Sequence, residues 1–333
     1  MDMYKWLEDV ISSEVKKPMP ILSFPGTQLI GVGVDELVRD GALQARCMKA
    51  IADRYATLAS VSLMDLSVEA EAFGSPVRFS EDEVPTVSAR ILETEADIQS
   101  LKVPEVGAGR TGEYVKTIRE AKKLIKDRPV LAGHIGPFSL SGRLLDMNEI
   151  MVMSMTEPEV VEDVLEKATQ FLLQYVQAFK AAGADGVVIA EPAAGLLSPA
   201  LNARLSVPYL KRIVEAVQDE SFIVVYHNCG NTLPLIQDIL KIGAKALHFG
   251  NAIDLEKMLP QVPPDVVVMG NVDPSSQFRN GTPESVTERV DGLLEKLSKY
   301  PNYVISSGCD IPPLSPLTNI DAFFAAVKDF YSK

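Results

Sequence analysis

One histidine and two cysteines have the types and spacing to form a metal site. His227 and Cys229 are separated by one residue, and Cys309 lies 80 residues further along the chain. One imidazole and two thiolates form a ligand set for zinc, and three protein ligands leave a fourth position open, as in catalytic sites. The His-x-Cys spacing alone is weak evidence. The prediction therefore depends on a fold that brings Cys309 to the other two.

The hydrophobic pattern predicts such a fold. Short apolar runs rich in β-branched residues alternate with helical patterns, which is typical of parallel strands joined by helices. Eight such units predict an α/β fold, a single (β/α)8 TIM barrel domain over residues 1–333. The predicted strands cover residues 19–24, 60–66, 129–134, 186–191, 222–227, 244–249, 265–271 and 303–307.

The barrel is expected to carry an N-terminal helical extension and a long excursion after the second strand. Residues 73–106 are rich in Glu and Pro and weak in periodicity, and we expect a lid or a subsidiary hairpin there. One crossover helix is predicted to begin at Thr156, whose spacing to Glu159 matches a capping box. Another is predicted to begin at Thr282, which is followed by Pro283.

Barrels of this kind have their active sites at the C-terminal ends of the strands. Strands five and eight open onto the same mouth, so Cys309 can meet His227 and Cys229 there, and we predict that the three act as metal ligands and in catalysis. Other polar side chains at strand ends are candidates for binding substrate: Asp65, His134, Glu191, Asn271 and Asp273.

Each of these candidates has a structural alternative. His134 and His248 could each hydrogen-bond a ligand or be histidines satisfied within the fold. Glu191 could be a fourth zinc ligand, a partner of a ligand or one half of a salt bridge, and we favour the second role. Asn271 and Asp273 could instead only shape a turn before the next residue, a proline.

Composition narrows the classes of partner. The formal net charge is −13, which disfavours nucleic acid and anionic membrane surfaces. Three cysteines cannot form a disulfide scaffold in so long a chain, and Cys47 fits a helix face as a small apolar residue. Neither a signal peptide nor an apolar stretch long enough to cross a bilayer is visible, so we expect a cytoplasmic protein.

Several short runs resemble one known family. Residues 227–232 (HNCGNT), 269–274 (MGNVDP) and 307–313 (SGCDIPP), together with 65–74 and 191–199, are similar to the uroporphyrinogen decarboxylase superfamily. Within it they resemble the methylcobamide:coenzyme M methyltransferases. The resemblance extends over nearly the whole chain, and it implies the same barrel fold.

Two departures from the decarboxylases favour the methyltransferase branch. Decarboxylases of the family carry arginines after strand one to bind the carboxylates of their substrate, whereas this loop reads FPGTQ and no arginine precedes Arg39. Decarboxylases also place a histidine near the end of strand eight, where this chain has Cys309.

The resemblance implies a zinc-dependent methyltransferase. It would move a methyl group from a methylated corrinoid, such as methylcobalamin, to a small thiol such as coenzyme M. His227, Cys229 and Cys309 would hold Zn²⁺, and Asp65, Asn271 and Asp273 would hold the thiol or the corrinoid edge. Before the acceptor binds, the fourth ligand of the zinc ion could be water, Glu191 or His248.

The resemblance also implies a partner protein and leaves other functions open. No Asp-x-His-x-x-Gly run is present, so a separate carrier protein is expected to supply the corrinoid. The acceptor could also be a pterin such as tetrahydrofolate, and the oligomeric state is left open, a homodimer included. The alternatives to a methyltransferase are a decarboxylase-type lyase and a non-catalytic corrinoid- or thiol-binding module.

Overall fold

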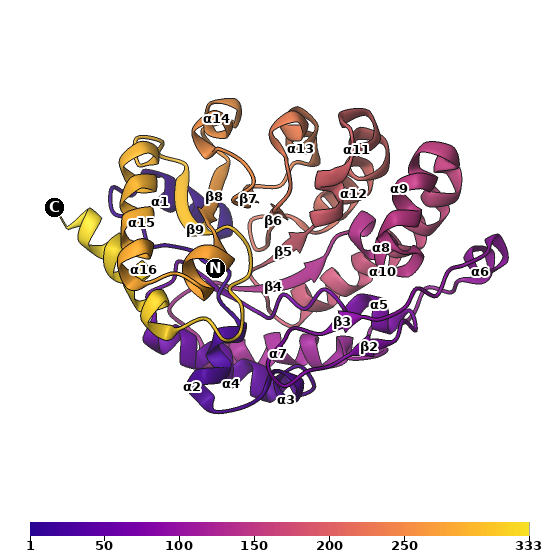
Figure 1. Cartoon of the computed structure of the whole chain (residues 1–333), viewed down its shortest axis with the longest axis horizontal. Helices are drawn as coiled ribbons and strands as arrows, with labels where there is room; N and C mark the ends of the chain where they lie inside the picture. Colours follow the sequence, from indigo (N-terminus) through magenta and orange to yellow (C-terminus); the bar gives the residue numbers. More distant parts are fainter. Residues whose placement is uncertain (333) are drawn as a thin grey trace.

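The computed structural model describes residues 1–332 and contains a curled parallel sheet of seven strands with helices around its outside (Figure 1). Val and Ile dominate these strands because both faces are buried, one inside the barrel and one under the helices. In sheet order the strands are β1 (Ser60–Val61), β4 (Val130–Ile135), β5 (Gly186–Ala190), β6 (Ile223–Asn228), β7 (Ala246–Phe249), β8 (Val267–Val272) and β9 (Tyr303–Ser307).

The predicted strand over residues 19–24 is wrong as a regular strand. The segment nevertheless lies between the two edges of the sheet, because Leu58 N donates to Pro18 O at 2.9 Å and Met19 N donates to Ile305 O at 3.0 Å. Pro18 and Pro20 have no N–H group and cannot take part in a continuous ladder. The segment therefore fills the eighth position of the barrel, and the predicted fold class is confirmed.

Helices cover the outside of the barrel and its ends. The α-helices are α1 (Met3–Ser12), α2 (Thr27–Ile30), α3 (Val34–Leu37), α4 (Gly41–Arg54), α5 (Val68–Ala72), α6 (Glu95–Ser100), α7 (Thr111–Leu124), α8 (Pro137–Leu145), α9 (Met147–Thr156), α10 (Pro158–Ala181), α11 (Pro199–Leu205), α12 (Val207–Val217), α13 (Ile236–Ile239), α14 (Leu255–Met258), α15 (Pro283–Leu297) and α16 (Leu317–Tyr331). The 3₁₀ helices are η1 (Phe24–Gly26), η2 (Pro192–Leu196), η3 (Leu233–Leu235), η4 (Leu240–Ile242) and η5 (Leu259–Gln261), and η6 (Pro274–Arg279) is a π-helix. None of the helices within residues 1–332 combines the length and the apolar content needed to span a membrane.

One predicted helix start is wrong and the other is confirmed. Thr156 is the last residue of α9, and α10 begins at Pro158 after Glu157, so the capping box at Thr156 does not form. A proline keeps the residue before it out of helical geometry and suits the first helical position, which separates the two helices. Thr282 caps α15 as predicted, since its side chain accepts a hydrogen bond from Ser285 N.

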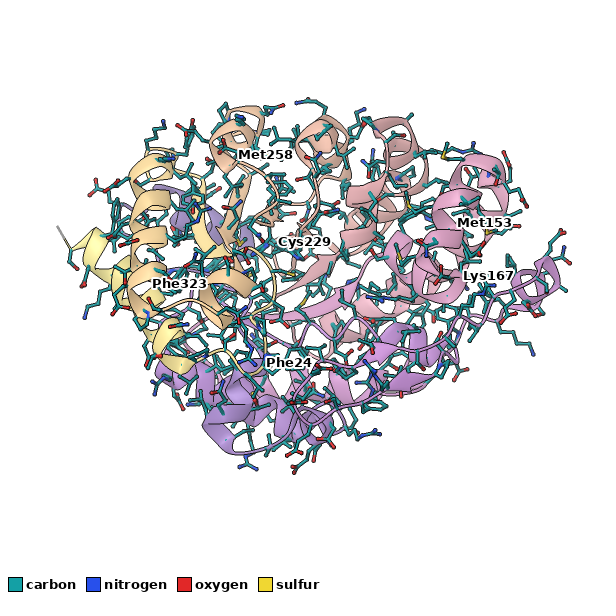
Figure 2. All side chains as sticks on the ribbon, in the orientation of Figure 1. Phe24, Met153, Lys167, Cys229, Met258 and Phe323 are labelled. Atoms are coloured by element: carbon teal, nitrogen blue, oxygen red, sulfur yellow. The ribbon has the colours of Figure 1, made fainter. Side chains whose placement is uncertain are left out.

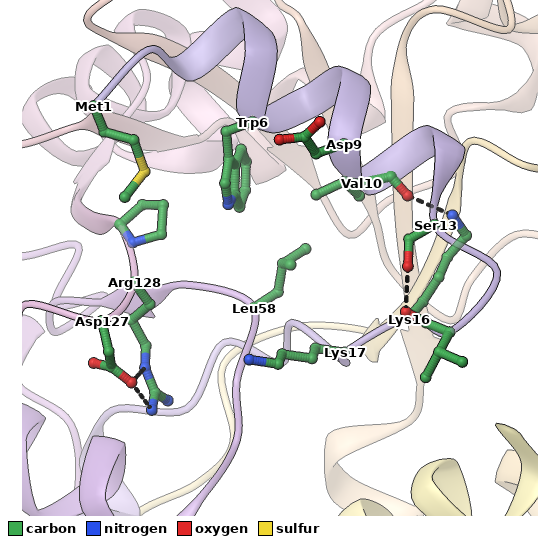
Figure 3. Close-up of a pocket in the computed structure, with 12 residues that line it drawn as sticks. Met1, Trp6, Asp9, Val10, Ser13, Lys16, Lys17, Leu58, Asp127 and Arg128 are labelled. Atoms are coloured by element: carbon green, nitrogen blue, oxygen red, sulfur yellow. Dashed lines mark hydrogen bonds and ion pairs between the residues drawn. The ribbon is translucent and has the colours of Figure 1, made fainter. Parts of the chain in front are cut away.

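The predicted N-terminal helical extension is α1, which packs across the N-terminal ends of the strands. Its residues Leu7 and Val10 join the apolar cluster inside the barrel. Beside α1 lies a cavity of about 270 Å³, into which Trp6 and Leu58 point from opposite sides (Figure 3). Lys16 Nζ, at its edge, donates to Val10 O at 2.5 Å. This cavity is at the opposite end of the barrel from the predicted active site.

The excursion after β1 forms the subsidiary hairpin that was one of the two expectations for it. Strands β2 (Val77–Arg78) and β3 (Thr86–Val87) pair antiparallel, and α6 follows them. Val84 and Val87 of the hairpin line a cavity together with Asp310 and Ile311, so the hairpin lies at the end of the barrel where the strands end.

Candidate metal centre at the barrel mouth

The structure brings His227, Cys229 and Cys309 together at the C-terminal end of the barrel. His227 is the penultimate residue of β6, Cys229 directly follows that strand, and Cys309 lies two residues beyond β9. One potential ligand atom from each of the three lies within 4.8 Å of the others, and Cys309 Sγ is 3.5 Å from His227 Nε2. Cys229 lies near the centre of the molecule, inside the ring of helices (Figure 2).

Local sequence explains why Cys229 faces the other two. The Asn228 side chain donates to Glu191 O at 2.6 Å and accepts from Gly230 N at 2.8 Å, which turns the chain sharply after β6. Gly250, after β7, lies against this turn, where a Cβ atom would come within 2.5 Å of Cys229 Cα. Only glycine leaves room for the turn at that position.

The three donors fit a zinc ion. Zinc–nitrogen and zinc–sulfur bonds of about 2.0 to 2.3 Å in a tetrahedron place neighbouring ligand atoms about 3.3 to 3.8 Å apart. Cys309 Sγ and His227 Nε2, 3.5 Å apart, already have that spacing, and the other pairs of ligand atoms lie within 4.8 Å. His227 is buried, whereas Cys229 and Cys309 are partly exposed, so the sulfur side of the cluster is the side reachable from solvent.

Of the two neighbouring thiols, Cys229 is the one that readily loses its proton. The Cys309 thiol and the His227 imidazole next to Cys229 lower the pKa of Cys229 to about 4. The same contact with Cys229 raises the pKa of the Cys309 thiol, because a second thiolate beside the first is repelled. The pair therefore readily holds one negative charge, and a divalent cation would compensate the second.

A chain of hydrogen bonds sets the orientation of His227. Ser306 Oγ donates to Met19 O at 2.6 Å, so the same oxygen is left to accept from His248 Nε2 at 2.7 Å. His248 Nδ1 is then an acceptor, and it lies 2.8 Å from His227 Nδ1. Followed in this order, the proton of His227 is on Nδ1 and the lone pair of Nε2 faces the two sulfurs.

Asp65, which was predicted to bind substrate, is bonded to other side chains of the protein. Its side chain is fully buried and forms an ion pair with Arg110 at 2.5 Å. Tyr114 Oη donates to the same oxygen at 3.0 Å, and Ser67 N and Oγ donate to the other. These contacts tie the segment after β1 to the beginning of α7, so we assign Asp65 to the scaffold of the mouth.

His134 lies on the outer face of the sheet. Leu131 belongs to the cluster inside the barrel, so the two-residue period of β4 turns His134 toward the helices. Its ring lies beside that of Tyr175 on α10, with centroids 6.5 Å apart. Burial lowers the pKa of His134 to about 4, which keeps the ring neutral. This position separates His134 from the thiolate pair.

Glu191 anchors a helix. Its carboxylate oxygens accept from Phe138 N at 3.0 Å and Ser139 N at 2.6 Å, at the N-terminus of α8. Burial raises the pKa of Glu191 to about 7. Both oxygens are used in this way, so Glu191 supports the mouth through α8, while its backbone carbonyl holds Asn228.

Asn271 and Asp273 hold loops at the same rim. The Asn271 side chain donates to Gly250 O and Ile253 O, both at 2.9 Å, and so fixes the loop after β7. Asp273 Oδ1 accepts from Ser275 N at 2.8 Å and from Ser276 N at 3.2 Å and caps η6. The contacts of Asp273 are those of the turn-shaping alternative.

Ser306 is a site residue that was not predicted from the sequence. The signal was present, because Val304 lies inside the barrel and Ser306 is two residues further along the same strand. His248 also points inward, from β7 on the far side of β8, so the two side chains can meet by a hydrogen bond inside the barrel.

The chain belongs to the uroporphyrinogen decarboxylase family, since the sequence profile described as Uroporphyrinogen decarboxylase (URO-D) matches residues 19–330. Among its relatives is the methylcobamide:CoM methyltransferase MtbA of Methanosarcina acetivorans, 27% identical over 270 residues that cover 80% of this chain and 78% of that protein. A uroporphyrinogen decarboxylase of Anaeromyxobacter sp. is 28% identical over 312 residues, 90% and 88% of the two chains.

The fold has a close counterpart among solved structures. A methyltransferase from Methanosarcina mazei superimposes with a TM-score of 0.86 and 23% identity, covering 99% of both chains. The predicted resemblance to the family, and within it to the methylcobamide:coenzyme M methyltransferases, is confirmed.

Proposed function

We propose that this chain is a zinc-dependent methyltransferase that moves a methyl group from a methylated corrinoid, carried by a partner protein, to a small thiol such as coenzyme M. The observation that carries the proposal is the convergence of His227, Cys229 and Cys309 at the barrel mouth. The similarity to methyltransferases that act between methylcobamide and coenzyme M supports it. Reduced thiols at the site fit a cytoplasmic enzyme.

His227, Cys229 and Cys309 would hold the zinc ion. When bound, Zn²⁺ supplies a Lewis-acidic centre that lowers the pKa of an acceptor thiol and makes it a thiolate at neutral pH. The two cysteine thiolates balance the charge of the ion, so the acceptor sulfur keeps its electron density. Histidine and cysteines are therefore positioning and charge-setting groups for the nucleophile.

The transfer itself is a displacement at the methyl carbon. The acceptor sulfur forms a bond to carbon, the carbon–cobalt bond breaks, and its electron pair leaves with the corrinoid as cobalt(I). The proton of the acceptor thiol is released to solvent. The partly exposed sulfur side of the cluster faces the mouth, from which a corrinoid on its carrier must approach.

The loop at residues 24–28, which follows the segment in the eighth barrel position, argues against a decarboxylase activity for this chain. Phe24 and Pro25 are buried there, and the Gln28 side chain donates to Pro313 O and Ser315 O, each at 2.9 Å. A porphyrinogen with many carboxylates needs cationic donors, and this loop offers an amide that is already bonded.

The experiment is a methyl-transfer assay. Zinc-loaded protein is incubated with methylcobalamin and 2-mercaptoethanesulfonate, and released cob(I)alamin is followed by its absorbance under anaerobic conditions. We expect turnover that is lost in Cys229→Ala and kept in Cys47→Ala, which alters a buried cysteine away from the mouth. Tetrahydrofolate as the acceptor and uroporphyrinogen as the substrate complete the panel. Decarboxylation of uroporphyrinogen without methyl transfer would contradict the proposal.

A further inference from the structure

A cavity of about 310 Å³ lies at the barrel mouth, between the hairpin and the loop after β9. Its walls are mostly apolar and include Met64 from the segment that follows β1, Val84 and Val87 from the hairpin, and Ile311. Asp310, the residue that follows Cys309, also lines it. The cavity therefore lies beside the candidate metal centre, and residues of the excursion form part of its lining.

Arg143 is the cation in this wall. It lies on α8, whose N-terminus is anchored by Glu191, and its side chain is half-buried at the cavity. Within residues 1–332 no group accepts a hydrogen bond from its guanidinium or forms an ion pair with it. Burial lowers the pKa of Arg143, with only Asp65 acting in the other direction. A guanidinium facing apolar walls without an anion is unfavourable.

The carboxylates near Arg143 do not act as its anionic partner. Asp65 is already bonded to Arg110, Tyr114 and Ser67. Asp310 lines the same cavity, but its Oδ1 accepts from Ser23 Oγ at 3.2 Å, and it forms no ion pair with Arg143 in the described structure. The missing partner of Arg143 is therefore expected to come from a ligand.

We propose that this cavity receives the acidic end of the methyl acceptor, with Arg143 pairing its sulfonate or carboxylate. The inference rests on the proposed function, because it places the acceptor sulfur at the cluster of His227, Cys229 and Cys309. A volume of about 310 Å³ is at the lower end of the range for ligand pockets, about 300 to 1,000 Å³. The acceptor class is accordingly a short thiol with an anionic end group.

The test compares acceptors that differ only in their end group. 2-Mercaptoethanesulfonate, 3-mercaptopropionate and homocysteine carry an acid, whereas 2-mercaptoethanol is neutral. In Arg143→Met we expect KM for the preferred acidic thiol to rise about 10- to 100-fold, with kcat/KM for 2-mercaptoethanol changed by less than about threefold. Arg143→Lys should recover part of the loss, because it keeps the charge without the planar fork. Arg90→Met, at an arginine paired with Glu149 near the surface, is the control.

A binding measurement separates this inference from the proposed function. Ethanesulfonate and propionate have the acidic end but no thiol, so calorimetric titration measures the anion site without methyl transfer. Binding of either that is lost in Arg143→Met and kept in Arg90→Met would support the site even if no thiol is methylated, and the two anions distinguish sulfonate from carboxylate. Equal affinity in wild type and Arg143→Met, or an equal loss of activity toward acidic and neutral thiols, would overturn it.

Discussion

His227 Nδ1 lies 2.8 Å from His248 Nδ1, and the two residues pair in register on neighbouring strands β6 and β7. One of these nitrogens must carry the proton of the hydrogen bond. Because Ser306 Oγ already donates to Met19 O, it accepts from His248 Nε2, which leaves His248 Nδ1 as the acceptor. The proton then belongs to His227 Nδ1, and His227 Nε2 is free to bind a metal.

The first prediction concerns Ser306. In Ser306→Ala the acceptor for His248 Nε2 is removed, so the tautomer of His227 is no longer fixed, and zinc affinity should fall about 10-fold or more. ¹⁵N-histidine NMR can assign the tautomers, because the chain has three histidines in all. Ser307→Ala is the matched control, since its buried hydroxyl accepts from Ile21 N and does not contact either ring. Unchanged tautomers and zinc affinity in Ser306→Ala would refute the proton order.

The second prediction concerns the ion pair at the end of β1. Arg110→Met should reduce the free energy of unfolding by about 3 to 5 kcal/mol, because it leaves the buried Asp65 carboxylate without its cation. Arg54→Met, which removes the exposed pair with Asp321, should cost about 0 to 1 kcal/mol. Urea denaturation measures both. Similar small losses in the two variants would show that the buried pair does not support the mouth.

The third prediction is a pH dependence of stability from Glu69. Burial raises its pKa from 4.5 to about 8, with Asp65 adding to the rise. Between these two values the folded chain holds a proton that the unfolded chain has lost, so stability contributed by this group is present below pH 4.5 and is lost as pH rises toward 8.

Glu69→Gln should remove this contribution, which is up to about 1.4 kcal/mol per pH unit within that window. Urea denaturation at intervals from pH 5 to pH 8 gives the slope, and the exposed Glu8→Gln serves as the control. A slope that is the same in wild type and Glu69→Gln would mean that the carboxyl is not held in its neutral form by burial.

Sequence patterns predicted the barrel and the meeting of Cys309 with His227 because both follow from strand order and from where strands end. Sequence patterns failed where a shift of one residue along a strand decides which face of the sheet a side chain lies on. The strand predicted to end at His134 continues to Ile135, and its two-residue period turns His134 to the helices. Asp65 and Glu191 were correctly expected near the mouth, but their hydrogen-bond partners come from segments that no local pattern connects to them.

Arg143 shows a different limit. It is an isolated charge in the apolar helix α8, PFSLSGRLL, and that contrast is visible in the sequence. Whether such a charge is paired depends on side chains from β1, the hairpin and the loop after β9, which only the folded chain places around it.

Zinc content is the most direct test of the central claim, that His227, Cys229 and Cys309 form one metal site. Wild-type protein purified with zinc, and Cys47→Ala, should each hold about one equivalent by elemental analysis, and Cys229→Ala and Cys309→Ala should lose it. In the cobalt-substituted wild type, a thiolate-to-cobalt absorption band should appear and should weaken in each of these two variants. Metal-free wild-type protein, or zinc retained in full after both cysteines are replaced, would contradict the account.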